Sequence, residues 1–195
     1  MAEDRTTNIG DFIDMQDIDN MDFSSTLRLR ARSIDQRKLW ESKDRSAEFL
    51  GDIWSLFVDL KKEERIITVL HSVCVELIEN SVKYGRQEHD YIITIELCLT
   101  SNELMVYVIN KSDLSQVPKL EAFAQLILNS DDYKKLFKQK MKEARVAKKQ
   151  GKRKSQLGYI RIAMQNVRLA WQIKTRPEAA VVTTMARISL ATEEA

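Results

Sequence analysis

The sequence predicts an α+β fold, a two-layer α/β sandwich in which a mixed, mostly antiparallel sheet carries helices on one face. Two observations predict this class. Apolar and polar residues alternate over 26–32, 91–100 and 103–110, which is typical of half-buried strands. Residues 66–82 contain no Gly or Pro and are apolar over most of a helix circumference, as in a helix packed between other elements. We therefore expect a long helix to lie against the sheet.

The first part of the chain combines a strand with helices. In 26–32, Leu27 and Leu29 face one way and the arginines between them face the other, which favours a half-buried strand at a sheet edge. Residues 33–60 hold one or two helices, and their aromatic residues at helical spacing indicate core packing. The helix that contains the apolar run spans about 62–84.

A hairpin and two helices follow. Residues 91–100 and 103–110 are rich in β-branched and apolar residues and are separated by a turn, so we expect them to pair. One helix begins after Pro118 and ends near residue 128. A second helix spans 131–150 and has a narrow apolar stripe.

The last part of the chain predicts a helix at 158–170 and then two strands, 171–176 and 181–190. A turn at Pro177 joins the strands. The final strand is the segment richest in β-branched residues, so we expect it to be central or well covered.

Acidic and basic residues concentrate in two segments, although the 195-residue chain has a formal net charge of only +2. Residues 1–22 contain seven acidic residues against Arg5 alone, and we expect a flexible tail before a single domain at 23–192. Residues 134–154 contain eleven Lys and Arg against Glu143 alone. The two segments could attract each other within one chain or between two copies, so a homodimer stays open.

Composition favours a cytoplasmic protein. A hydrophobic content of 44% and a charged content of 31% fit a soluble globular domain. Cys74 and Cys98 lie inside apolar segments, which is typical of reduced core residues in the cytosol. His71 and His89 are isolated, so we expect no zinc site. No apolar run reaches about 18 residues, so we expect no membrane span.

A polar stripe follows the apolar helix to its end. Glu76, Asn80 and Lys83 are spaced at i, i+4 and i+7, so they lie on one side of the helix. Gly85 follows where a left-handed C-cap would end the helix. One amide oxygen together with phosphates suffices to bind magnesium, and a carboxylate one turn away can polarise a nucleophile. A solvated helix face would show the same spacing, so this alternative stays open.

This stretch resembles the first nucleotide-binding box of the histidine-kinase-like ATPases, the superfamily of gyrase, Hsp90, histidine kinases and MutL. The chain is most similar to the SiaB-type and anti-sigma-factor-like partner-switching serine kinases. The resemblance implies a sandwich of the histidine-kinase-like ATPase type that binds ATP and Mg²⁺. It also implies that Glu76 is the catalytic base and Asn80 the magnesium ligand. Lys83 and Gly85 would belong to the ATP site.

Two further boxes of the superfamily are partly matched. Asn110 stands where an Asp binds the adenine amino group, and an Asn oxygen can accept the same hydrogen bond. In the glycine-rich box the chain keeps Gly158 but replaces the upstream glycines with cationic and polar residues. The resemblance then implies that Lys152 and Lys154 contact phosphates in place of a backbone cradle. The excursion at about 112–157 would be the ATP lid.

The basic segment 134–154 leaves several interpretations open. It could be a lid that attracts phosphates, a surface for an acidic partner, or a contact for nucleic acid or an anionic membrane. It could also be a solvated helix. Nucleic acid is the least favoured partner.

Two functions from different classes follow from these observations. The first, implied by the resemblance, is a bacterial partner-switching signalling protein that binds a small antagonist-type protein and phosphorylates it on Ser or Thr. The second is a non-catalytic relative that keeps the fold and acts as a protein-binding adaptor. The intact first box favours the kinase and the altered glycine-rich box favours the adaptor, so enzyme status stays open.

Overall fold

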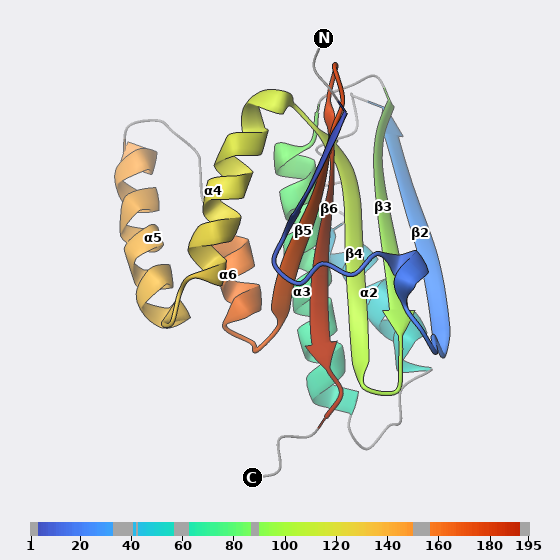
Figure 1. Ribbon diagram of the computed structural model, residues 1–195. Helices are drawn as coiled ribbons and strands as arrows, with labels where there is room; N and C mark the ends of the chain where they lie inside the picture. Colours follow the sequence, from blue (N-terminus) through green and yellow to red (C-terminus); the bar gives the residue numbers. More distant parts are fainter. Residues whose placement is uncertain are drawn as a thin grey trace.

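Six strands of the described chain form one open sheet in the order β1-β5-β6-β4-β3-β2 (Figure 1). The computed structural model describes residues 4–32, 41, 43–56, 63–86, 90–149 and 157–191. The strands are β1 (Arg5–Ile9), β2 (Phe23–Arg32), β3 (Asp90–Leu99), β4 (Glu103–Ser112), β5 (Arg168–Thr175) and β6 (Ala180–Ser189). Each pairing among these strands is antiparallel, so the parallel component of the predicted mixed sheet is not found in the described residues.

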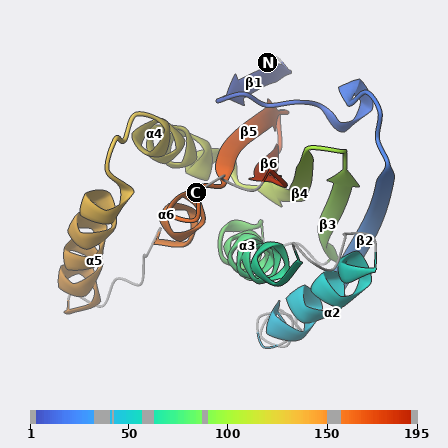
Figure 2. The same cartoon turned by 90° about the horizontal axis from the view of Figure 1, so that it is seen from below.

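The α-helices gather on one face of this sheet, so the α+β sandwich is confirmed (Figure 2). They are α2 (Lys43–Ser55), α3 (Glu63–Tyr84), α4 (Val117–Leu128), α5 (Tyr133–Lys149) and α6 (Leu157–Ala163). The short 3₁₀ helices are η1 (Met15–Asp17) and η4 (Leu114–Gln116). In Figure 2, α3 lies across the middle of the sheet, whereas α5 is the outermost helix, beyond α6. Among the described helices none is both long and apolar enough to span a membrane.

The main hydrophobic core lies between the helices and the sheet. Leu70, Leu77 and Ile78 of α3 are buried in one cluster with Ile93 and Ile95 of β3. This packing explains both predicted patterns, because the strands bury every second residue on the helix side and α3 is apolar over most of its surface.

Most predicted strands are confirmed. The predicted edge strand is β2, which begins three residues earlier, at Phe23, and pairs with β3 alone. The predicted hairpin is formed by β3 and β4. The strongly β-branched final strand is β6, which lies between β4 and β5 and is therefore central as predicted.

The predicted helix at 158–170 is wrong in its second half. Helix α6 ends at Ala163, and β5 already begins at Arg168. Asn166 lies in the turn between them at a φ of 60°. Asn tolerates this left-handed conformation better than most residues, so it allows the tight reversal that the helical periodicity concealed.

The predicted flexible tail is also corrected. Of residues 1–22 the structure describes 4–22, and these residues pack against the sheet. Strand β1 pairs with β5, and residues 10–22, the N-terminal strap, then cross the face opposite the helices (Figures 1 and 2). The physical reason is a second hydrophobic cluster. The strap contributes five apolar side chains to it: Phe12, Ile13, Met15, Ile18 and Met21.

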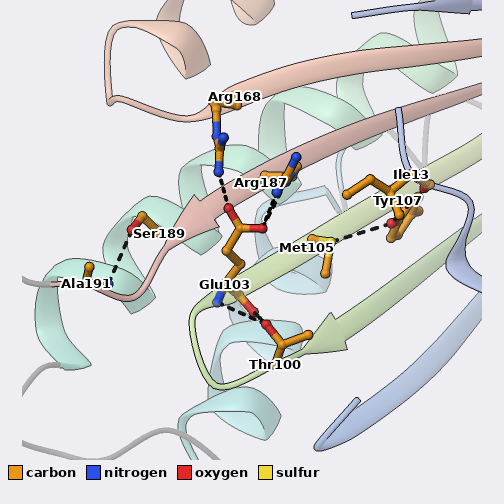
Figure 3. A network of polar contacts seen from close by, with 9 residues as sticks. All are labelled: Ile13, Thr100, Glu103, Met105, Tyr107, Arg168, Arg187, Ser189 and Ala191. Atoms are coloured by element: carbon orange, nitrogen blue, oxygen red, sulfur yellow. Dashed lines mark hydrogen bonds and ion pairs between the residues drawn. The ribbon is translucent and has the colours of Figure 1, made fainter. Parts of the chain in front are cut away.

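Polar contacts reinforce the strap face (Figure 3). The Tyr107 hydroxyl of β4 donates a hydrogen bond to the Ile13 carbonyl of the strap, with an O–O distance of 3.0 Å. Near the end of the same strand, the Glu103 carboxylate accepts hydrogen bonds from Arg168 and Arg187. The contacts of Glu103 join β4, β5 and β6 at one end of the sheet. The contact of Tyr107 holds the strap against the middle of the sheet.

Candidate functional site

The polar stripe of α3 is enclosed by α6. The Asn80 side chain is buried, and the Glu76 side chain is only 12% exposed. Helix α6 approaches so closely because residue 158 is a glycine. A Cβ atom placed on Gly158 would lie 2.4 Å from Oε2 of Glu76 and 3.2 Å from Nδ2 of Asn80. The structure therefore brings Glu76, Asn80 and Gly158 together.

An ion pair that sequence reasoning missed holds Glu76. The Arg161 guanidinium of α6 donates from Nη1 to Oε1 of Glu76 at 2.8 Å. The other carboxylate oxygen, Oε2, faces Gly158. Arg161 follows Gly158 by three residues and thus lies on the same side of α6, which is the one signal that could have predicted the pair.

Asn80 presents a buried amide that lacks a partner. Its Nδ2 is one of two buried side-chain atoms without a hydrogen bond among the described residues. An unsatisfied buried polar group costs about 1–3 kcal/mol, so it is rarely kept without a reason. Asn80 also lines a cavity, which allows a ligand to satisfy this amide.

The cavity has a volume of about 390 Å³ and lies between the sheet and the helices α3, α4, α5 and α6. This volume falls in the range of small-molecule sites. Its polar lining residues are Asn80, Asn110, Ser112, Gln116, Lys119 and Lys140. Its apolar and aromatic lining residues are Tyr84, Leu120, Ala122, Phe123, Leu126, Tyr159 and Val182. Apolar walls with a few polar groups are typical of sites that bind a flat organic ring and orient it.

Asn110 lies at the polar side of this cavity and is itself buried. Its Oδ1 accepts a hydrogen bond from the Ser81 hydroxyl at 3.3 Å, and its Nδ2 donates to the Lys111 carbonyl at 3.2 Å. An amide oxygen has two lone pairs, so Oδ1 keeps one for a ligand. The contact with Ser81 fixes how this amide points.

The end of α3 is tied to β4 next to Asn110. The Ser112 hydroxyl donates to the Tyr84 carbonyl at 3.2 Å, and Gly85 forms an isolated bridge with Ser112. The predicted left-handed cap at Gly85 is wrong, because among the described glycines only Gly10 has a positive φ, at 75°. Gly85 instead continues the helical hydrogen bonding, since its N–H donates to the Ser81 carbonyl.

Lys83 and Gly85 do not belong to the described cavity lining. The Lys83 ammonium lies 5.3 Å from the centroid of the Tyr84 ring. Burial lowers the pKa of Lys83, while the carboxylates of Glu79 and Glu76 oppose this change. The positive charge of Lys83 therefore lies near the negative charges of Glu79 and Glu76 on α3. Of the remaining predicted site residues, Lys152 and Lys154 lie outside the described residues.

Tyr84 and Glu79 carry the clearest electrostatic effects near the cavity. Burial raises the pKa of Tyr84 to about 12, so its phenol is neutral near pH 7. Burial also raises the pKa of Glu79, and the Glu76 carboxylate adds to the change. The charged forms of both groups are therefore poorly solvated.

Two cavity lysines were not predicted as site residues. Lys119 lies in α4 and Lys140 in α5, and both line the cavity. These helices are far from the polar stripe of α3 in sequence. Gln116 at the N-cap of α4 and Lys119 and Phe123 within α4 recur at helical spacing, and this stripe is the only sequence signal for that wall.

The described residues contain no group of three or more His, Cys, Asp and Glu side chains that could hold a metal ion alone. No known family model matches the sequence, and no curated protein matches it either.

Proposed function

We propose that this chain is a signalling protein of the histidine-kinase-like ATPase type that binds an adenine nucleotide in the cavity beside α3. One observation carries the proposal. Asn80 of α3 and Asn110 of β4 are 30 positions apart in sequence, yet both line a cavity of about 390 Å³. These are the two positions that the resemblance assigns to magnesium and adenine.

The cavity walls suit an adenine ring. Leu120, Phe123 and Tyr159 provide apolar and aromatic surface on which a flat ring can be buried. The Asn110 oxygen can accept from an exocyclic amino group, and its orientation is fixed by Ser81. Lys119 and Lys140 line the same cavity and favour an anionic ligand.

Among the cavity residues, Asn80 is the one that could bind magnesium. Asn80 lines the cavity, its amide nitrogen beside Gly158 has no partner, and an amide oxygen is a ligand type that magnesium accepts. Asn80 would hold the ion together with phosphate oxygens of the nucleotide. When bound, the ion would neutralise phosphate charge.

The geometry favours binding over turnover in this conformation. Glu76 would have to take a proton from a Ser or Thr hydroxyl of the antagonist-type partner, but its carboxylate is held by Arg161 and faces Gly158. Glu76 also lies outside the described cavity lining. The second candidate, a nucleotide-binding adaptor without catalysis, is therefore supported by the ion pair between Glu76 and Arg161.

Calorimetric titration with Mg²⁺-ATP tests the proposal. We expect saturable binding by the wild-type protein and loss of most affinity in Asn80→Ala. Asn102→Ala is the matched control, because Asn102 is an exposed residue of the turn between β3 and β4. Unchanged binding in Asn80→Ala, or no binding by the wild type, would refute the site.

A turnover assay then separates the two candidates. If the protein is a kinase, Arg161→Gln should raise the rate of ATP turnover by freeing Glu76, and adding Glu76→Gln should abolish that gain. If it is an adaptor, binding persists and neither variant turns over ATP. Glu76→Gln should leave nucleotide affinity nearly unchanged in both cases.

A further inference from the structure

The sheet face opposite the helices is divided into two halves by the strand register. Paired residues of antiparallel strands lie on the same face, so each row of partners can be followed across the sheet. The strap covers the rows that contain Tyr107 and Met105. Two further rows, the open rows, lie beyond them. The first contains Arg28, Thr94, Ile109, Thr183, Gln172 and Asn8. The second consists of two parts, Arg30 with Ile92 on β2 and β3, and Lys111, Val181, Lys174 and Thr6 on β4, β6, β5 and β1.

The open rows form a basic surface. Arg28, Arg30, Lys111 and Lys174 are all exposed, and the twelve residues of these rows include no Asp or Glu. The apolar members lie between the cations, and Ile92 is 38% exposed. The surface therefore combines four positive charges with one exposed apolar side chain, Ile92, while Thr94 and Gln172 between them are buried, a composition that suits an acidic partner.

The strap that borders these rows has the opposite charge. Its thirteen residues contain five aspartates and no Lys or Arg. The aspartates are Asp11, Asp14, Asp17, Asp19 and Asp22, and all but the half-buried Asp14 are exposed. The strap runs along the outside of the sheet, level with its middle, while the strands extend beyond it toward the open rows (Figure 1). A layer packed on a sheet stands about 10 Å above it, so this face has a raised acidic half and a recessed basic half.

We propose that two copies of this chain associate through this face, with the strap of each copy seated on the open rows of the other. A two-fold axis parallel to the rows, lying between the strap and the open rows, turns the raised half of one copy onto the recessed half of the other. Such an isologous contact repeats the same charge pairing twice and closes after two copies. In this arrangement the raised acidic strap of each copy meets the recessed basic rows of the other, so both shape and charge are complementary.

A second copy fits this surface better than nucleic acid. Sheet surfaces that bind single-stranded nucleic acid stack bases on aromatic side chains, and the open rows contain no Phe, Tyr or Trp. The required acidic segment, by contrast, belongs to this same chain and lies at the edge of the surface. The dimer does not depend on the proposed nucleotide site, which lies on the other face of the sheet.

Sedimentation velocity of the full chain across protein concentration and salt tests the dimer. We expect a monomer–dimer equilibrium whose dissociation constant rises on the order of tenfold or more between low and high salt, because the contacts are exposed ion pairs. A monomer at every concentration, or association that salt does not weaken, would overturn the proposal.

A charge swap identifies the interface. The basic-row variant is Arg28→Glu with Lys174→Glu, and the strap variant is Asp17→Lys with Asp19→Lys. Each variant alone should lose the dimer, because like charges then face each other. An equimolar mixture of the two should form a heterodimer. The acidic rows of the basic-row variant then meet the basic strap of the strap variant, and the acidic strap of the first meets the basic rows of the second.

The swap also contains its own folding control. All four positions are exposed, so each variant should keep the wild-type melting temperature within a few degrees, and a restored heterodimer proves that both chains are folded. The quadruple variant in one chain should again form a homodimer. If neither the mixture nor the quadruple variant associates, the second copy is not the occupant of the open rows, and a foreign acidic protein becomes the better candidate.

Discussion

The two faces of the sheet are built in different ways. The helix side buries a continuous core that includes Trp54, Trp171 and Leu77, and it encloses the cavity beside α3. The strap side has a small cluster whose buried members are Cys98, Met105, Tyr107, Ala170 and Met185. Most of the buried apolar side chains and the candidate ligand site therefore lie on one face, whereas the other face has a small apolar cluster under an acidic strap, which we expect to open more easily.

Truncation of a side chain should lower the free energy of unfolding far more in the helix-side core than under the strap. Ile78→Ala removes a fully buried side chain of α3 and should lower the free energy of unfolding by about 2–5 kcal/mol. Phe12→Ala removes a half-buried strap residue and should cost clearly less. Denaturant titration measures both values. Equal losses would mean that the strap belongs to the main folding unit.

The next effect tests the close approach of α6 to α3. Gly158→Ala places a methyl group against Glu76 and should destabilise the protein by about 1–3 kcal/mol. Gly51→Ala is the matched control in the middle of α2, where the nearest atom to an added Cβ is 3.8 Å away. This control should stabilise the protein by about 0.4–1 kcal/mol. A neutral Gly158→Ala would contradict the tight contact between α6 and α3.

The reactivity of the two buried cysteines, one on each side of the sheet, provides a third comparison between the faces. Cys74 is buried in the helix core, where burial raises its pKa to about 12, and Cys98 is buried under the strap. Tyr107→Phe removes the hydrogen bond to the strap and should cost about 0.5–1.5 kcal/mol. Alkylation of Cys98 should then become faster, while Cys74 stays unreactive. Equal acceleration at both cysteines would indicate global unfolding instead.

The smallest effect is the pH dependence that Glu79 adds beside the cavity. Its folded-state pKa is raised above 4.5, first by burial and then by Glu76. Stability from this group is therefore present below pH 4.5 and lost as the pH rises through the raised pKa. Glu79→Gln should remove this loss in denaturant titrations across pH.

Glu143 provides a control of opposite sign. The hydrogen bond from Lys140 lowers the pKa of Glu143, so its stability is present above pH 4.5 and lost as the pH falls through the lowered pKa. Glu143→Gln should flatten the acid side of the curve. The assignment fails if both variants shift the curve in the same direction.

The fold was predictable where one physical pattern dominates. The alternation in β3 and β4 and the apolar surface of α3 come from burial against one core, so periodicity was enough to place them. The strap was not predictable from periodicity. Its apolar residues, such as Phe12, Ile13 and Met15, follow neither a helical nor a strand repeat and are diluted by aspartates.

The candidate site was predictable only in part. The spacing of Glu76, Asn80 and Lys83 gave the stripe, but it did not indicate which members reach the cavity. That depends on α6, whose Arg161 binds Glu76, and the only sequence signal for this long-range contact is the spacing of Gly158 and Arg161 within α6. Lys119 likewise reaches the cavity from a separate helix.

Hydrogen exchange with and without Mg²⁺-ATP tests whether a nucleotide binds beside Asn80 and Asn110, because it reports on both faces of the sheet in one experiment. We predict protection of residues 80–84, 110–112 and 117–126 around the cavity, with no change in the strap. The same experiment on Asn80→Ala should show no protection. Protection confined to the basic helix α5, or none anywhere, would contradict a nucleotide site beside Asn80 and Asn110.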